Sequence, residues 1–246
     1  MIVACDGRIG RLCRLPVCRW SLLWSSRLAV VSTLSAGAIV AGCDSAGTPM
    51  TAPGQVSGRT EPIVGLPCEG CEAVFQGLPD TLQSRARIAP VDEPGQPMRI
   101  EGTVVDRRGR PVSGVIVYAY HTNAQGVYPT DERFRGQAAF RHGRLRAWVQ
   151  TDERGRYTFD TIRPGGYPNT DLPEHVHMHV LEVGRCTYYI DDIMFEDDPR
   201  LTPAMLVRLT LGRGGSGVAR PQRDAAGVQV VTRDIVLGER IPGYPD

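Results

Sequence analysis

Three histidines at alternate positions constrain the fold of this 246-residue chain more than any other feature. They lie in residues 174–180, which read EHVHMHV. Alternate side chains of a β-strand share a face, so we predict that His175, His177 and His179 project together while the apolar residues between them enter a core. Neutral imidazoles in such a row suit iron, copper or zinc, whereas magnesium and calcium prefer oxygen ligands. Histidine pairs also occur in metal-free strands, so the row alone identifies no metal.

The remainder of the chain favours an all-β fold. Short apolar runs alternate with turn residues, and the sequence holds 28 glycines and 19 prolines. We predict about eight short strands and a β-sandwich over residues 99–246, with a lead-in segment at 63–98 that holds a CxxC pair. Residues 106–111 predict a hairpin-like reversal, and residues 78–87 a short helix. The predicted strands are 99–105, 115–121, 145–151, 157–162, 175–183, 187–195, 205–211 and 228–237.

The N-terminal part is typical of a bacterial lipoprotein signal. Residues 1–42 carry five arginines before an apolar stretch, and the segment 40–43 reads VAGC. This pattern predicts cleavage before Cys43, a lipid anchor on that cysteine, and a location in the cell envelope outside the cytoplasm. Residues 43–62 are rich in Ser, Gly, Thr and Pro and are predicted to form a flexible tether. A transmembrane anchor is the alternative, although the apolar run is shorter than a span usually needs.

Charge and cysteine content narrow the function classes. All 28 basic residues are arginines, and without residues 1–42 the chain keeps 23 basic and 26 acidic residues. No basic stripe is left that would favour nucleic acid as a partner. Cys68 and Cys71 form the CxxC pair, and no second CxxC completes a zinc site. We predict a structural disulfide, either between these two or from one of them to Cys186, with one thiol left over.

Four segments in order resemble a known family. They are 102–106 (GTVVD), 114–128 (GVIVYAYHTNAQGVY), 151–168 (TDERGRYTFDTIRPGGYP) and 175–177 (HVH). Together they resemble the intradiol ring-cleavage dioxygenases, the family of protocatechuate 3,4-dioxygenase and catechol 1,2-dioxygenase, over roughly residues 100–195. The opening of this pattern also occurs in transthyretin-like modules, so that part supports the fold without the activity.

The resemblance implies a metal site and a reaction. It implies a ferric ion, Fe(III), held by Tyr128, Tyr167, His175 and His177, with Tyr128 and His175 equatorial and Tyr167 and His177 axial. The expected activity is oxidative cleavage of a catecholic aromatic by O₂ between its two hydroxylated carbons, which gives a muconate-type diacid. Tyrosinate is a hard anionic donor that favours ferric over ferrous iron. Tyr167 would leave the metal and accept a substrate proton.

One departure from the family and two other hypotheses remain. The family commonly has Arg-Pro-Ala before its histidine pair, whereas residues 172–174 read LPE, and Arg146 or Arg163 could replace the missing guanidinium.

Two other functions remain open. A non-catalytic β-sandwich binding lipoprotein is one alternative to the enzyme. A copper or zinc site on His175, His177 and His179 is the other. We expect His121 to be structural or to support the metal ligands from behind, and His142, in an arginine-rich loop, to be solvated.

Overall fold

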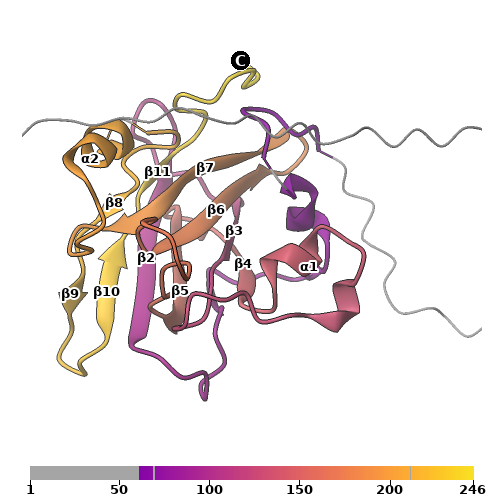
Figure 1. Cartoon of the computed structure of the whole chain (residues 1–246). Coiled ribbons are helices and arrows are strands. Elements are labelled where there is room, and N and C mark those ends of the chain that lie inside the picture. Colours follow the sequence, from indigo (N-terminus) through magenta and orange to yellow (C-terminus); the bar gives the residue numbers. More distant parts are fainter. Residues whose placement is uncertain (1–60, 69, 211) are drawn as a thin grey trace, which may run out of the picture. The chain divides into compact units, whose positions relative to one another are not determined.

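Two β-sheets form the body of the molecule, which confirms the predicted all-β sandwich (Figure 1). The computed structural model describes residues 61–246 except 69 and 211, so the predicted signal peptide, Cys43 and residues 43–60 lie outside the described residues. One sheet has the order β1-β5-β2-β10-β9, with β11 also paired to β2, and the other has the order β4-β3-β6-β7-β8. The strands are β1 (Arg85–Arg87), β2 (Pro97–Val105), β3 (Ile116–Tyr120), β4 (Arg146–Gln150), β5 (Arg156–Ile162), β6 (His175–Glu182), β7 (Cys186–Phe195), β8 (Val218–Ala219), β9 (Gln222–Arg223), β10 (Gln229–Thr232) and β11 (Ile235–Val236).

The main core lies between the two sheets and follows the alternation read from the sequence. In β6, the three apolar residues between and after the histidines are fully buried and belong to this core, as predicted: Val176, Met178 and Val180. They meet inward residues of β2 such as Ile100 and Val104, which are also fully buried. The histidines therefore project from the outer face of the β4-β3-β6-β7-β8 sheet.

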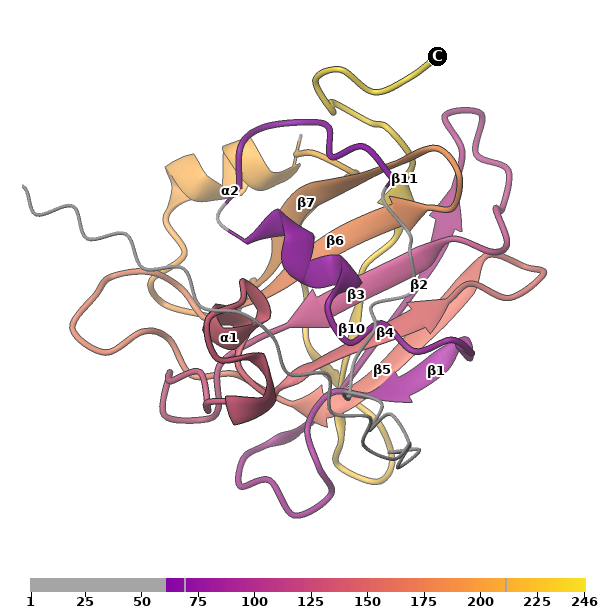
Figure 2. The same ribbon diagram turned by 90° about the vertical axis from the view of Figure 1, so that its right-hand side faces the viewer.

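A second apolar cluster covers that outer face. The 3₁₀ turn η1 (Cys71–Phe75) lies over this sheet and contacts β6, and the short helix α1 (Ala139–His142) packs against η1 (Figure 2). Trp148 donates a hydrogen bond of 2.7 Å from Nε1 to the carbonyl of Val74 and stacks on Tyr118. Because both faces of β3 are covered, all five of its residues are buried, and the strand shows no polar alternation.

The predicted turn at 106–111 is present, but the strands around it separate. The Asp106 side chain accepts hydrogen bonds from the backbone N–H groups of Arg108 and Arg110, which closes the turn. After a single bridge between Val105 and Pro111, β2 continues in one sheet and β3 in the other. The reversal is therefore a connection between the layers of the sandwich rather than a paired hairpin.

The prediction of a strand at 205–211 is wrong, because helix α2 (Pro203–Thr210) occupies that stretch. Thr202 caps it: its hydroxyl accepts a hydrogen bond of 3.3 Å from the N–H of Met205 and its carbonyl bonds Leu206. Proline in the first turn and threonine just before it are helix-start signals. Leu209 is buried while Val207 is exposed, as a period of 3.6 residues requires.

Two other predicted elements also differ. No helix forms at 78–87; Gly77 has a positive φ of 82° and Pro79 follows, after which β1 pairs in parallel with β5. The strand predicted at 228–237 is broken into β10 and β11, which both pair with β2. The break falls at Arg233, whose side chain turns into the protein and is 1% exposed.

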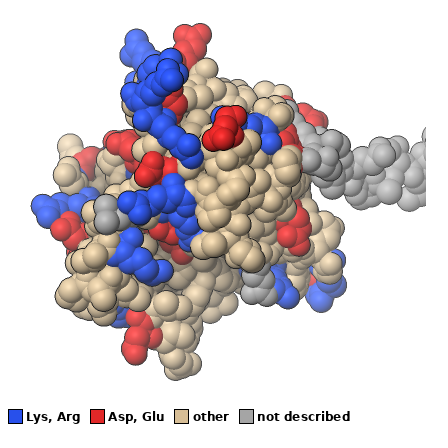
Figure 3. Space-filling view, turned by 90° about the horizontal axis from the view of Figure 1, so that it is seen from above, with Lys and Arg blue, Asp and Glu red and all other residues tan. Residues whose placement is uncertain are grey.

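Charged side chains are interspersed on the surface drawn in Figure 3, with carboxylates next to arginines. Representative pairs are Arg163 with Asp197 and Arg213 with Asp191. Within the described residues, neither helix has the length and hydrophobicity that crossing a membrane would require.

Candidate metal centre

The four predicted ligands, two tyrosines and two histidines, bring their side-chain oxygen and nitrogen atoms together. The phenol oxygens of Tyr128 and Tyr167 lie 2.6 Å apart. Nε2 of His177 lies 2.8 Å from the Tyr128 oxygen and 3.2 Å from the Tyr167 oxygen, and Nε2 of His175 lies 3.2 Å from the Tyr167 oxygen. Residues that are up to 49 positions apart in the chain are thus brought together as predicted.

The loops that carry the two phenols are held together by backbone contacts. The Asn123 side chain accepts hydrogen bonds of 3.0 Å from the N–H groups of Gln125 and Val127, which shapes the turn before Tyr128. The carbonyl of Asn123 accepts a bond of 2.9 Å from the N–H of Gly165. A β-carbon on Gly165 would lie only 2.5 Å from the carbonyl oxygen of Ala124, so glycine is required for this approach.

We expect Gly165→Ala to separate the two phenols. The added methyl group meets backbone rather than a movable side chain, and such overpacking costs about 1–3 kcal/mol. Thermal unfolding should show that loss, and metal content after purification should fall. Gly184→Ala, in the open β6–β7 turn with a φ of 73° and no atom within 4 Å of the new methyl group, is the control and should keep its metal. Equal metal content in the two variants would contradict this role of Gly165.

Both histidines are oriented by their second ring nitrogen. Nδ1 of His175 donates to the carbonyl of Pro173 at 2.7 Å, and Nδ1 of His177 donates to Asp192 at 2.9 Å. The hydroxyl of Tyr189 also donates to Asp192, at 3.0 Å. These bonds place the proton on Nδ1 and leave the Nε2 lone pairs directed at the phenol oxygens, as metal-binding histidines require.

We predict that Asp192→Asn weakens metal binding by about 10–100-fold. The amide accepts a weaker hydrogen bond from His177 than the carboxylate and makes Nε2 less basic. Competition with a chelator measures the effect. Asp191→Asn, which removes the neighbouring carboxylate bonded to Arg213, is the matched control and should bind metal as the parent does. Unchanged affinity in Asp192→Asn would remove this carboxylate from the account.

The electrostatics of the cluster call for a cation. Burial raises the pKa of both phenols, and for Tyr128 the hydrogen bond with Tyr167 adds to the rise. Burial also lowers the pKa of His175. Without a metal ion the two phenols therefore keep their protons, which they must lose to act as anionic donors. A highly charged metal ion reverses this preference, and two phenolates with two imidazoles form a donor set that fits ferric iron.

The other three histidines, His121, His142 and His179, are all buried but lie in different surroundings. His121 is buried and structural as expected, with Nε2 bonded to Thr161 at 2.6 Å and Nδ1 bonded to the carbonyl of Thr122 at 2.6 Å. The prediction that His142 is solvated was wrong: it ends α1, is 2% exposed and stacks on Tyr120 at 3.6 Å. His179 is also 2% exposed, and among the described residues its ring nitrogens group with two cysteines rather than with the other two histidines of β6. The three-histidine site is therefore not formed.

Neither arginine proposed as a replacement lies in the pocket. Arg163 is held by Glu174 at 2.6 Å and by both oxygens of Asp197. Arg146 stacks on Phe134 and donates to the carbonyl of Gln76. Arg141 of α1 does line the pocket. No local pattern indicated this role for Arg141, because its position depends on how α1 packs.

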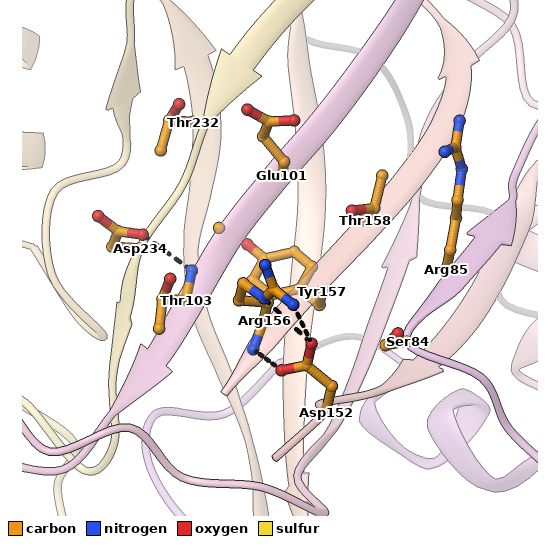
Figure 4. A pocket seen from close by; sticks show the side chains of 11 residues that line it. Ser84, Arg85, Glu101, Thr103, Asp152, Arg156, Tyr157, Thr158, Thr232 and Asp234 are labelled. Carbon is orange, nitrogen blue, oxygen red and sulfur yellow. Dashed lines mark hydrogen bonds and ion pairs between the residues drawn. The ribbon is translucent and has the colours of Figure 1, made fainter. Parts of the chain in front are cut away.

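A pocket of about 270 Å³ opens beside the four ligand atoms. Aromatic rings make most of its wall, and its lining residues are Cys68, Tyr120, Tyr128, Arg141, His142, Tyr167, His177, His179 and Tyr189. A larger hollow of about 480 Å³ lies elsewhere, over β2 and β5 (Figure 4). Its carboxylates are already engaged, Asp152 with Arg156 and Asp234 with the N–H of Thr103, so it offers no reactive cluster.

The structure also shows which of the three described cysteines pair. Cys68 and Cys71 form a disulfide, and Cys186, in β7, is a buried free thiol. This confirms the predicted structural disulfide and selects the pairing that the spacing left open.

Comparison with known proteins agrees with this site. The family model described as "Dioxygenase" matches residues 74–222. The chain is 38% identical over 84 residues to catechol 1,2-dioxygenase 1 of Acinetobacter lwoffii, covering 34% of this chain and 26% of that protein. It is 32% identical over 145 residues to chlorocatechol 1,2-dioxygenase of Rhodococcus opacus, covering 52% of each. A third relative is the protocatechuate 3,4-dioxygenase beta chain of Burkholderia cepacia, 31% identical over 121 residues, with 44% of this chain and 48% of that one covered.

Solved structures show the same fold. The dioxygenase domain of a dioxygenase and carbohydrate-binding protein fusion from Streptomyces sp. SirexAA-E superposes with a TM-score of 0.50 at 23% identity, covering 65% of this chain and 91% of that one. A variant of catechol 1,2-dioxygenase from Acinetobacter radioresistens gives a TM-score of 0.51 at 23% identity, covering 69% and 62%. The chain spans between about a quarter and a half of the curated relatives described above. On the match over residues 74–222, this chain belongs to the family of intradiol ring-cleavage dioxygenases.

Proposed function

We propose that this chain is a non-haem ferric dioxygenase that opens a catecholic ring with O₂ between the two hydroxylated carbons, which yields a muconate-type diacid. The observation that carries the proposal is the convergence of two phenol oxygens and two imidazole nitrogens, with neighbouring distances of 2.6–3.2 Å. A ferric ion bound there would supply a Lewis acid that binds both catechol oxygens and makes the ring reactive towards O₂.

Tyr167 is the proposed proton acceptor. Its hydroxyl contacts Tyr128 and both histidines, so it lies at the centre of the cluster. Burial raises the pKa of Tyr167, so its phenolate would be a strong base towards a catechol hydroxyl. Tyr167 would then accept a proton from a catechol hydroxyl, while Tyr128, His175 and His177 stay in place.

The pocket fits a small aromatic substrate. Its volume of about 270 Å³ is at the low end for ligand sites. Tyr189 contributes an aromatic ring to the wall, and Arg141 supplies positive charge there. We infer a single-ring catechol as the substrate class.

Purified protein tests this function directly. We expect a burgundy colour from charge transfer between tyrosinate and iron, about one iron per chain, and oxygen uptake with a single-ring catechol. Ultraviolet spectra of the product separate cleavage between the hydroxyls from cleavage beside them. A colourless protein with stoichiometric zinc would remove the proposal. Bound iron without oxygen uptake on any catechol would favour a binding lipoprotein instead.

We also propose that Cys43 carries a lipid and anchors the enzyme in the cell envelope. The segment VAGC after an apolar stretch supports this. Labelling of cells with a radioactive fatty acid should mark the parent protein and not Cys43→Ala. Equal labelling of both, or of neither, would contradict the anchor.

A further inference from the structure

A second group of metal-ligand atoms lies beside the pocket. The sulfur atoms of Cys68 and Cys71 and a ring nitrogen of His179 all lie within 4.8 Å of one another. Cys68 and His179 line the same pocket as Tyr128 and His177. Ligand atoms of a tetrahedral zinc ion lie roughly 3.5 Å apart, given bonds of about 2.0–2.3 Å, so small shifts would fit this group to an ion.

His142 lies next to this group and lines the same pocket as Cys68 and His179. Its side chain is 2% exposed, and its Nε2 is buried without a hydrogen-bond partner. Nδ1 lies 2.8 Å from the Tyr118 hydroxyl, which fixes the ring. In the tautomer in which Nδ1 donates to that oxygen, Nε2 has a free lone pair. That Nε2 lies 3.0 Å from where a β-carbon on Gly70 would be, and Gly70 stands between the two cysteines. An unpaired buried nitrogen is costly unless something binds it.

We propose that, when its cysteines are reduced, this chain binds a second metal ion of the zinc class through Cys68, Cys71, His142 and His179. Two thiolates from a C-x₂-C pair and two imidazoles are a typical tetrahedral zinc donor set. These residues are distinct from the four proposed iron ligands, and the inference does not depend on iron binding. Tyr120 links the two centres, since its ring stacks on His142 at 3.6 Å and on His177 at 4.5 Å.

The disulfide and the metal ion are alternative states of the same loop. In the structure Cys68 and Cys71 are joined, and a disulfide offers no thiolate. A dithiol reductant would supply two electrons and two protons, giving two cysteine thiols while the reductant becomes a disulfide. Each thiol then releases its proton to solvent as the divalent ion binds. A disulfide oxidant that accepts two electrons from the thiolates would re-form the Cys68–Cys71 bond and release the ion, so the metal content of this site would follow the redox state around the protein.

Cobalt is a suitable probe, because a tetrahedral cobalt thiolate site has intense near-ultraviolet charge-transfer bands and red d–d bands. We would titrate Co²⁺ into the full chain in detergent, freed of iron and reduced with a phosphine. We expect one equivalent to produce these bands in reduced protein, and none to appear in protein kept oxidised. X-ray absorption should give two sulfur and two nitrogen ligands.

Variants separate this site from the others. Cys68→Ser should lose the thiolate bands, while Cys186→Ser, which removes the buried thiol of β7, should keep them. His142→Gln should lose one nitrogen ligand. Tyr128→Phe should keep the cobalt signal, so a failure of the iron proposal leaves this one testable. Reduced parent protein without cobalt thiolate bands, or bands that persist in Cys68→Ser, would overturn the proposal.

Discussion

Tyr167→Phe should abolish both the colour and the catalysis of this protein. The variant lacks the oxygen that contacts Tyr128 and both histidines, and with it one anionic ligand and the proposed proton acceptor. Proton transfer by a placed side chain contributes about 10²–10⁴-fold, so we expect at least that loss in oxygen uptake with catechol. Visible spectra and an oxygen electrode measure the two effects.

A second phenylalanine substitution controls for the loss of a buried phenol. Tyr189→Phe removes a hydroxyl from the same pocket wall, one that bonds Asp192 and no proposed iron ligand. It should retain the tyrosinate band, with a smaller loss of rate. Wild-type oxygen uptake in Tyr167→Phe would show that the ligand assignment is wrong.

Arg233→Ala should give the largest loss of stability. The guanidinium is 1% exposed and donates to the backbone carbonyls of Gly214 at 3.0 Å and Asp234 at 2.6 Å, with longer bonds to Asp191 and Arg213. Truncation leaves these carbonyls without donors and opens a cavity between the sheets. We expect the free energy of unfolding to fall by about 3–5 kcal/mol, measured by urea denaturation.

Two other variants separate the causes of that loss. Arg233→Met keeps most of the volume and removes only the donors, so a loss of about 1–3 kcal/mol is expected. Arg85→Ala breaks an exposed ion pair with Asp160 in the same sheet and should cost less than about 1 kcal/mol. If Arg233→Ala is no more destabilising than Arg85→Ala, the buried guanidinium is not a structural support of the sheet.

The arrangement of the candidate metal centre could be predicted from the sequence because local patterns define most of it. Strand alternation places His175 and His177 on one face, and both lie at the cluster. The tyrosines stand in turns that contain glycine, and those glycines let the two loops approach closely. That the two tyrosines meet the histidines in space is a long-range contact, and it was predicted only from the family resemblance.

The rest depends on packing that a linear pattern does not contain. His142 stands among arginines and so suggested solvent, yet α1 folds it under η1 and against Tyr120. Cys68 and His179 are 111 positions apart, and nothing local connects them. The strand predicted at 205–211 was wrong for a different reason. The signals for the helix at Pro203–Thr210, Thr202 as cap and the proline after it, are visible in the sequence, but the run of apolar residues favoured a strand.

Anomalous X-ray diffraction at the iron edge, from crystals of the iron-loaded protein, tests the central claim most directly. The account predicts one strong peak within bonding distance of the phenol oxygens of Tyr128 and Tyr167 and of Nε2 of His175 and His177. An iron peak at any other place, or a peak here that either phenol oxygen does not reach, would contradict it.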